Sequence, residues 1–142
     1  MKSIKVKAPA TIANLACGFD VLGLCLDKPY DEIEVNTISD PVVKLKILNS
    51  TFSDVPDIPE KNTGGIPALK IIKDLNLDYG FAIEVKKGIP LCGGLGSSAA
   101  TASGVVFAIN KLLDNCLSKE DMLRYALEGE KISTSRAHID NI

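Results

Sequence analysis

Four glycines and two serines gather in the stretch 88–100, which follows a run typical of a strand and precedes a run of small apolar residues. Glycine lets a backbone approach a ligand without a Cβ in the way. The N–H groups of such a loop converge at the first turn of the next helix, where the helix dipole is worth about half a positive charge. This combination is typical of an anion site and suits phosphate well. The sequence therefore predicts a phosphate-binding loop.

The hydrophobic pattern predicts a strand before this loop. Alternating apolar residues predict strands over 4–8, 31–36, 43–48 and 81–86, the first ending at Pro9. The apolar run 21–26 predicts a buried strand, whereas 9–14 predicts irregular chain, 18–20 a turn and 49–61 an exposed loop. Because the early strands are joined by short turns, they predict an antiparallel meander or hairpins.

Helical spacing predicts three helices, one near Pro67, one over 98–113 and one after Ser118. Small residues in the second helix would let it lie close to a sheet while its N-terminus stays open to a ligand. Strands first and helices later, with one strand–helix junction at the loop, predict a two-layer α+β domain. The predicted buried faces are Ile66, Leu69, Ile72 and Leu75 on the first helix, and Met122, Leu123, Ala126 and Leu127 on the third.

Composition narrows the class of protein. The 142 residues fit one domain, 1–142, and a net charge of −2 predicts no nucleic-acid partner. No apolar run approaches the roughly 20 residues that span a membrane, so no membrane partner is expected. Four cysteines without a CxxC pair, with a single histidine, predict reduced thiols of a cytoplasmic protein rather than a structural zinc site. Cys92, inside the loop, is predicted to be a small apolar filler.

Two common phosphate loops do not fit. A Walker A loop needs a lysine after its last glycine, and Ser97 follows Gly96 here. A Rossmann fingerprint matches Gly94, Gly96 and Ala99, but it should follow its strand at once and lead to a second parallel strand. Here 88–93 intervenes and helix follows.

The loop instead resembles the P-x-x-x-G-L-G-S-S-A-A signature of the GHMP kinases, which include galactokinases, homoserine kinases and mevalonate kinases. The stretch 7–23 is similar to the A-P-A-T-x-A-N-L-G-P-G-F-D-x-L-G opening of homoserine kinases, with Ala16-Cys17 in place of Gly-Pro. His138-x-Asp140-Asn141 resembles their H-x-D-N motif. The chain is thus identified as a member of the homoserine kinase branch, and the ATP-binding residues that the signature implies are Pro90, Leu91, Cys92, Gly93, Gly94, Leu95, Gly96, Ser97, Ser98, Ala99 and Ala100.

The resemblance implies an enzyme that moves the γ-phosphoryl of ATP to the hydroxyl of L-homoserine, giving O-phospho-L-homoserine in threonine biosynthesis. It implies a GHMP kinase N-terminal domain, a two-layer fold like ribosomal protein S5 domain 2. Family members are roughly twice as long, so the chain is expected to be an N-terminal portion, inactive by itself. A cytoplasmic protein, homodimeric at full length, is compatible with this resemblance.

The resemblance also gives roles to residues. Ser98 and Glu130 match the family's Mg²⁺ positions, and a hydroxyl and a carboxylate are hard oxygen ligands. With Asn141 they are the expected catalytic residues, Asn141 orienting the substrate hydroxyl without taking its proton. Asn62 resembles the family residue near adenine. Homoserine binding is expected from Asn14, Asp20, His138, Asp140 and Asn141.

Plainer readings stay open for several of these residues. Ser98 also suits a helix N-cap, Asp20 a turn, and Glu128 is a rival to Glu130. The substrate carboxylate needs arginine, and family members supply it from the C-terminal half, beyond Arg124 and Arg136. The alternative functions are another GHMP kinase for a different small alcohol and a non-catalytic nucleotide-binding module of the same fold.

Overall fold

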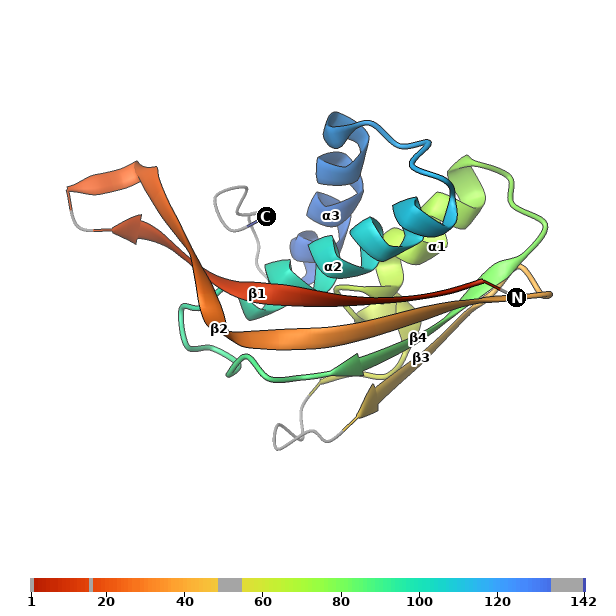
Figure 1. Cartoon of the computed structure of the whole chain (residues 1–142), viewed down its shortest axis with the longest axis horizontal. Helices are drawn as coiled ribbons and strands as arrows, with labels where there is room; N and C mark the ends of the chain where they lie inside the picture. Colours follow the sequence, from red (N-terminus) through yellow and green to blue (C-terminus); the bar gives the residue numbers. More distant parts are fainter. Residues whose placement is uncertain (1, 16, 49–54, 134–141) are drawn as a thin grey trace.

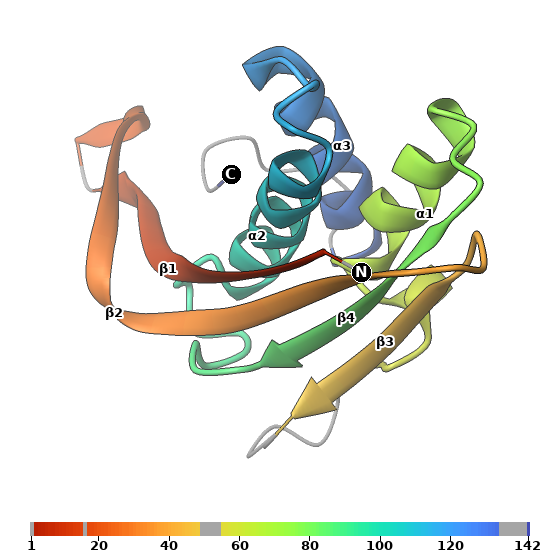
Figure 2. The ribbon, with the colours of Figure 1, turned by 45° about the vertical axis from the view of Figure 1, so that its right-hand side comes forward.

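The structure is a computed structural model, and it describes residues 2–15, 17–48, 55–133 and 142, without the side chains of Phe19, Asp20 and Ser133. These residues form two layers, a sheet and a layer of helices that covers one of its faces (Figures 1 and 2). The strands are β1 (Ser3–Leu15), β2 (Gly18–Ile38), β3 (Val43–Leu48) and β4 (Gly80–Lys86). The helices are α1 (Gly65–Asp74), α2 (Ser97–Leu112) and α3 (Lys119–Ser133), with a short 3₁₀ helix η1 (Pro59–Lys61). The predicted two-layer α+β fold is confirmed.

The strand order is β1-β2-β4-β3, so the predicted meander is wrong beyond the first hairpin. β2 pairs antiparallel with both β1 and β4, but β3 lies at the edge, parallel to β4. A parallel pair needs a crossover connection, which is usually helical. Here η1 and α1 supply it, and the loop after β4 then leads directly into α2.

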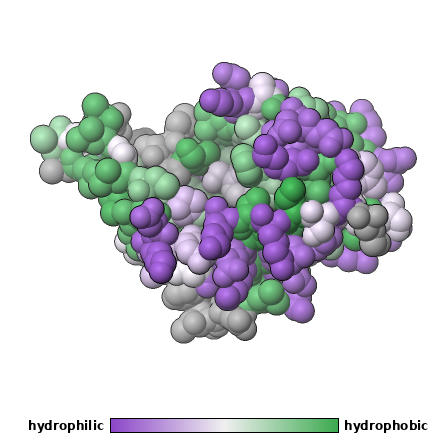
Figure 3. All heavy atoms as spheres, in the orientation of Figure 1, coloured by the Kyte–Doolittle hydropathy of each residue, from purple (hydrophilic) through white to green (hydrophobic). Residues whose placement is uncertain are grey.

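The hairpin of β1 and β2 is longer than the sequence predicts. The residues expected to be irregular after Pro9 continue β1, with register shifts between Pro9 and Thr11 and between Ala13 and Leu15. The expected buried strand 21–26 is instead an exposed part of β2, where Val21 is 81% exposed and Leu22 and Leu24 are each 53% exposed. The far part of the hairpin, residues 11–15 of β1 and 18–25 of β2, forms an arm that extends past the helices (Figures 1 and 3). Its backbone is paired, but in the described structure the helices do not cover it.

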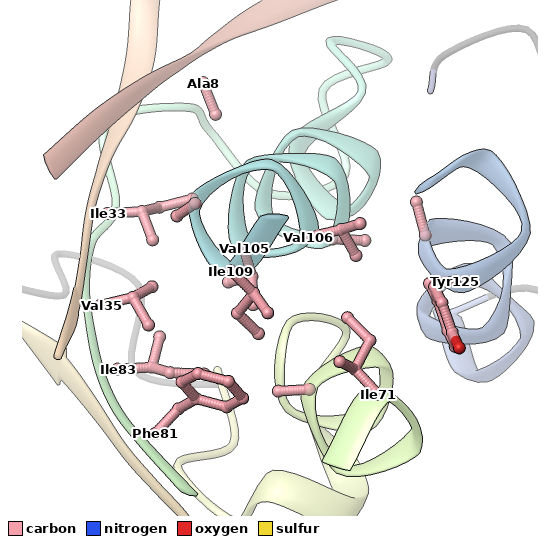
Figure 4. Close-up of a cluster of buried hydrophobic side chains, with 14 of the residues drawn as sticks. Ala8, Ile33, Val35, Ile71, Phe81, Ile83, Val105, Val106, Ile109 and Tyr125 are labelled. Carbon is pink, nitrogen blue, oxygen red and sulfur yellow. The ribbon is translucent and has the colours of Figure 1, made fainter. Parts of the chain in front are cut away.

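The core lies between the sheet and the helices (Figure 4). Ile33 and Val35 of β2 and Phe81 and Ile83 of β4 point from the sheet toward the helices. Each of these four side chains is at most 1% exposed. Alternation explains this arrangement, because every second residue of a strand faces the same side. The helical partners in the core include Ile71, Val105, Val106, Ile109 and Tyr125.

The first turns of α2 lie close to the sheet, as their small residues predict. A Cβ at Gly104 would lie 2.5 Å from Cδ1 of Ile33 and 2.9 Å from Cβ of Ala8, so glycine is required for this approach. Close packing holds the beginning of α2 over the middle of β2 and the end of β4, where the Thr101 hydroxyl contacts Asp31 and Lys87.

The predicted faces of the other helices are partly wrong. On α1, Leu75 is 37% exposed and the buried side chains include Pro67, Ala68 and Ile71. On α3, Leu123 is 36% exposed, while Tyr125 and Ala126 are buried. α3 packs against both α1 and α2, so its buried face is set by two neighbours rather than by one apolar stripe.

Candidate functional site

The glycine-rich loop ends at the N-terminus of α2, as predicted. Gly96 is the N-cap residue with φ 62°, and Gly94 has φ 67°. Both angles lie in the left-handed region that glycine adopts without steric cost. The N-cap residue, Gly96, makes no side-chain capping hydrogen bond. The N-terminus of a helix is a place where backbone N–H groups can bind an anion.

Cys92 differs from its prediction as an apolar filler. Its side chain is exposed and its φ is 56°, an unusual value for a residue with a side chain. The loop turns sharply there and directs the thiol away from the core. All four cysteines lie in the described part of the chain and are free thiols.

A backbone hydrogen bond connects β1 to the loop. The Thr11 N–H of β1 donates a hydrogen bond of 3.1 Å to the Leu95 carbonyl oxygen. Three residues further along the same strand, Asn14 has φ 60° at a register shift, so the backbone breaks its regular pairing there. Asn is among the residues that tolerate this conformation best. Asn14, expected to bind substrate, thus lies on the strand that contacts the loop.

A cavity of about 160 Å³ opens beside the start of α2. One wall is formed by the segment after β3, including Pro56, Asn62 and Thr63. The other wall comes from the loop and α2, namely Lys87, Leu91, Ser97, Ser98 and Thr101. The structure therefore brings Asn62 and Ser98, expected near adenine and metal, to the same cavity.

Asn62 is 2% exposed, and its side chain connects two backbone segments of this wall. Its Nδ2 donates to the Pro56 carbonyl oxygen at 2.7 Å, and its Oδ1 accepts from the Gly64 N–H at 2.8 Å. A primary amide has one further N–H and one further lone pair for a ligand. Asn62 can therefore shape the cavity and contact a base in it.

Glu130 lies on α3 and is 3% exposed, so the expected metal residue is a buried carboxylate. The preceding residue, Gly129, is pressed against the Asn62 wall, because a Cβ there would lie 2.0 Å from the Thr63 carbonyl oxygen. This contact places α3 directly behind the cavity. The described residues contain no group of three or more His, Cys, Asp or Glu side chains that could hold a metal ion.

Three buried polar residues beneath the loop were not predicted, namely Asp31, Lys87 and Thr101. Asp31 is 0% exposed and forms a salt bridge with Lys87. Burial lowers the pKa of the Lys87 ammonium from its usual 10.5, and the charge of Asp31 opposes this shift. The strand pattern could have predicted that Asp31 and Lys87 point inward, since they continue the inward-facing rows of Ile33 and Val85.

The remaining expected site residues fall outside the described structure. These are His138, Asp140 and Asn141, together with the side chain of Asp20. In the described part of the chain, no helix is long and apolar enough to cross a membrane.

Known proteins are similar to this chain over its whole length. The homoserine kinase of Methanococcus vannielii is 39% identical over 142 residues, which are 100% of this chain and 47% of that protein. The homoserine kinase of Xylella fastidiosa (strain M12) is 41% identical over 135 residues, 95% of this chain and 42% of that protein. The chain thus spans less than half the length of these relatives.

A solved structure is also similar to this chain. The crystal structure of homoserine kinase from Cytophaga hutchinsonii superimposes with a TM-score of 0.90 at 43% identity. The match covers 99% of this chain and 45% of that one. The family model described as the GHMP kinases N-terminal domain matches residues 65–142, which are more than half of the chain and include the loop, α2 and α3. The chain belongs to the GHMP kinase family.

Proposed function

We propose that this chain is the nucleotide-binding half of a homoserine kinase, which phosphorylates the hydroxyl of L-homoserine with ATP and supplies O-phospho-L-homoserine for threonine biosynthesis. The observation that carries the proposal is the likeness to the Cytophaga hutchinsonii homoserine kinase, with 43% identity over 99% of the chain. The glycine N-cap of α2 and the cavity beside it agree with a bound nucleotide. The proposed location is the cytoplasm, where free thiols stay reduced.

The proposed work of the loop is electrostatic. Phosphoryl transfer asks a protein mainly to position the phosphates and to neutralise developing charge. The N–H groups at the start of α2 would donate to the phosphates, and the cavity lined by Asn62 would hold the adenine. Leu91 and Val55, which also line it, offer apolar contact to a flat base.

Mg²⁺ is the proposed metal, with Ser98 and Glu130 as its protein ligands. The donor set fits, since a hydroxyl and a carboxylate are oxygen ligands and Mg²⁺ keeps several waters and phosphate oxygens of its own. When bound it would neutralise charge on the phosphates. Ser98 lines the cavity and Glu130 lies on the helix behind it, so both come from elements next to the proposed nucleotide.

The proposed substrate site is formed by Asn14, Asp20, His138, Asp140 and Asn141. Asp20 and Asp140 would attract the ammonium of homoserine, and Asn14 would hydrogen-bond one of its ends. Asn141 would orient the hydroxyl toward the γ-phosphorus. An amide cannot take the proton, so the transfer proposed here is direct and uses no strong general base.

The nucleotide half of the proposal can be tested on this chain alone. A fluorescent ATP analogue, mant-ATP, is titrated with Mg²⁺ present, and ATP is used to compete. Saturable binding that ATP displaces is expected. A chain that is folded by circular dichroism but binds no nucleotide would overturn the proposed function.

The kinase half is tested in a chimera that joins this chain to the second half of the Methanococcus vannielii relative. ADP release is measured with homoserine, mevalonate, galactose and shikimate. Release that depends on homoserine is expected, whereas a preference for another alcohol would assign a different GHMP kinase. This chain alone is expected to release no ADP with homoserine, because the substrate carboxylate needs arginines that the second half supplies.

A further inference from the structure

A closed polar cluster lies under the glycine-rich loop, at the end of the apolar core. Its members are Asp31 on β2, Lys87 directly after β4, and Thr101 in the second turn of α2. The side chain of Asp31 is 0% exposed and that of Lys87 is 2% exposed. An ion pair removed from water in this way is weak support for stability, because apolar side chains of similar volume often serve equally well. Stability alone therefore does not explain why this ion pair is buried here.

Asp31 holds the beginning of the loop. Its Oδ1 accepts hydrogen bonds from the backbone N–H groups of Gly88 at 2.9 Å and Ile89 at 3.1 Å. Its Oδ2 faces the Lys87 ammonium and the Thr101 hydroxyl. One carboxylate thus fixes two consecutive N–H groups at the point where the chain leaves the sheet.

Lys87 holds the end of the loop. Its Nζ donates to the Ser97 carbonyl oxygen at 3.1 Å and to Thr101 Oγ1 at 2.9 Å, as well as to Asp31. An ammonium has three N–H donors, and these three contacts use them all. Ser97 is the first residue of α2, and its hydroxyl donates back to the Ile89 carbonyl oxygen at 3.2 Å. The two ends of the loop are therefore joined twice, through the ion pair and through Ser97.

We propose that Asp31 and Lys87, linked through Thr101, are positioning residues that hold the two ends of the loop at the spacing in which its N–H groups converge on a phosphate. This inference rests on the proposed function and adds to it a pair that need not touch the nucleotide phosphates. The lysine acts on backbone groups instead of on the ligand, unlike the lysine of a Walker loop.

The physical reason is the cost of ordering a flexible loop. A loop with glycines at 93, 94 and 96 has many conformations, and binding must select one of them. When both ends are fixed in advance, less binding free energy is lost in that selection. Releasing one end of the loop should lower the affinity for ATP, because the phosphate contacts are weakened. The affinity for adenosine, which has no phosphates, should stay nearly unchanged.

The test compares two affinities of the 142-residue chain with Mg²⁺ present. Displacement of mant-ATP gives the affinity for ATP and for adenosine in wild type, D31N and K87M, and thermal unfolding is followed in parallel. We expect D31N, at a residue that does not line the cavity, to lose about tenfold or more in ATP affinity with adenosine affinity within twofold. K87M should lose ATP affinity to a similar degree, and because Lys87 lines the cavity its adenosine affinity is not used as a control. The matched control is V35A, on the same inward row of β2 but away from the loop, which should lower Tm and change neither affinity.

Thr101 supplies a second pair of variants in case the charge variants do not fold. T101S keeps the hydroxyl between the two charges, and T101V keeps the shape without it. T101S should bind ATP within twofold of wild type, and T101V should bind several-fold more weakly. Equal ATP affinity in the two, or D31N losing ATP and adenosine affinity in equal proportion, would overturn the inference alone. A folded wild type that binds no ATP overturns the proposed function together with it.

Discussion

Glu130 and Asn141 have different roles in the proposed mechanism. Glu130, 3% exposed on α3, would ligate the metal, while Asn141 would only orient the substrate hydroxyl. Loss of a charge-stabilising group commonly costs about 100-fold or more in rate. We therefore expect E130A and E130Q in the chimera to lose roughly 100-fold or more in kcat, and N141A about tenfold.

The control for this comparison is E128A, two residues before Glu130 on the same helix. Glu128 pairs at 2.8 Å with Lys131 on the surface, and such exposed pairs contribute little. Its kcat should stay within about twofold of wild type. Because E130Q keeps the shape of the buried side chain, its unfolding temperature separates a catalytic loss from a folding defect. Equal collapse of E130A and N141A would contradict the division of roles.

At the scale of elements, the start of α2 is the part whose conformation matters most. Gly96 has φ 62°, and an alanine in this left-handed region costs roughly 1–2 kcal/mol. G96A is therefore expected to lower the free energy of unfolding by about 1 kcal/mol and to weaken mant-ATP binding roughly tenfold, because the N–H groups of the first turn shift.

A matched backbone control exists at the end of α1. Asn76 has φ 49°, also in the left-handed region; it is exposed and precedes β4, whereas the loop follows the other end of that strand. N76A should have a comparable unfolding cost but leave nucleotide affinity unchanged. If both variants weaken binding to the same degree, the effect of G96A is general destabilisation and the loop plays no special part.

The elements also show what sequence could predict. Local patterns were sufficient for β4, the loop and α2, since a strand, a glycine run and a helix of small residues follow directly in the chain. The parallel pairing of β3 with β4 could not be read in the same way, because it depends on where the crossover through α1 returns. The face of α3 was mistaken at Leu123 because two other helices decide which side is buried.

The same limit applies to the site. Leu91, Ser97 and Ser98 of the loop motif line one cavity together with Asn62, and their roles there stay a prediction. Asp31 and Lys87 lie 56 positions apart in the chain, and neither belongs to a motif that was recognised. Only the register of β2 against β4, which pairs Glu32 with Lys86, makes them neighbours. Contacts of this kind depend on strand pairing that a single sequence does not specify.

At the scale of the whole molecule, the uneven distribution of apolar surface stands out. On the face seen in Figure 3 the body carries many polar side chains among hydrophobic ones, while the arm of β1 and β2 presents mainly hydrophobic ones. Val21, Leu22 and Leu24 of this arm are among the large hydrophobic side chains most exposed in the described structure. Exposed apolar strands favour association with other chains. The arm is therefore expected to govern solubility of this chain more than its stability.

The triple variant V21T/L22T/L24T tests this expectation, since threonine keeps strand propensity and removes apolar surface. Exposed positions usually change stability by no more than about 0.5 kcal/mol each, so urea unfolding should be nearly unaffected. Sedimentation velocity over a range of concentrations should show less self-association than wild type. The control is V35T in the core, 0% exposed, where a buried hydroxyl should cost roughly 1–3 kcal/mol. A triple variant that lost more stability than V35T would mean that the arm packs against the rest of the molecule.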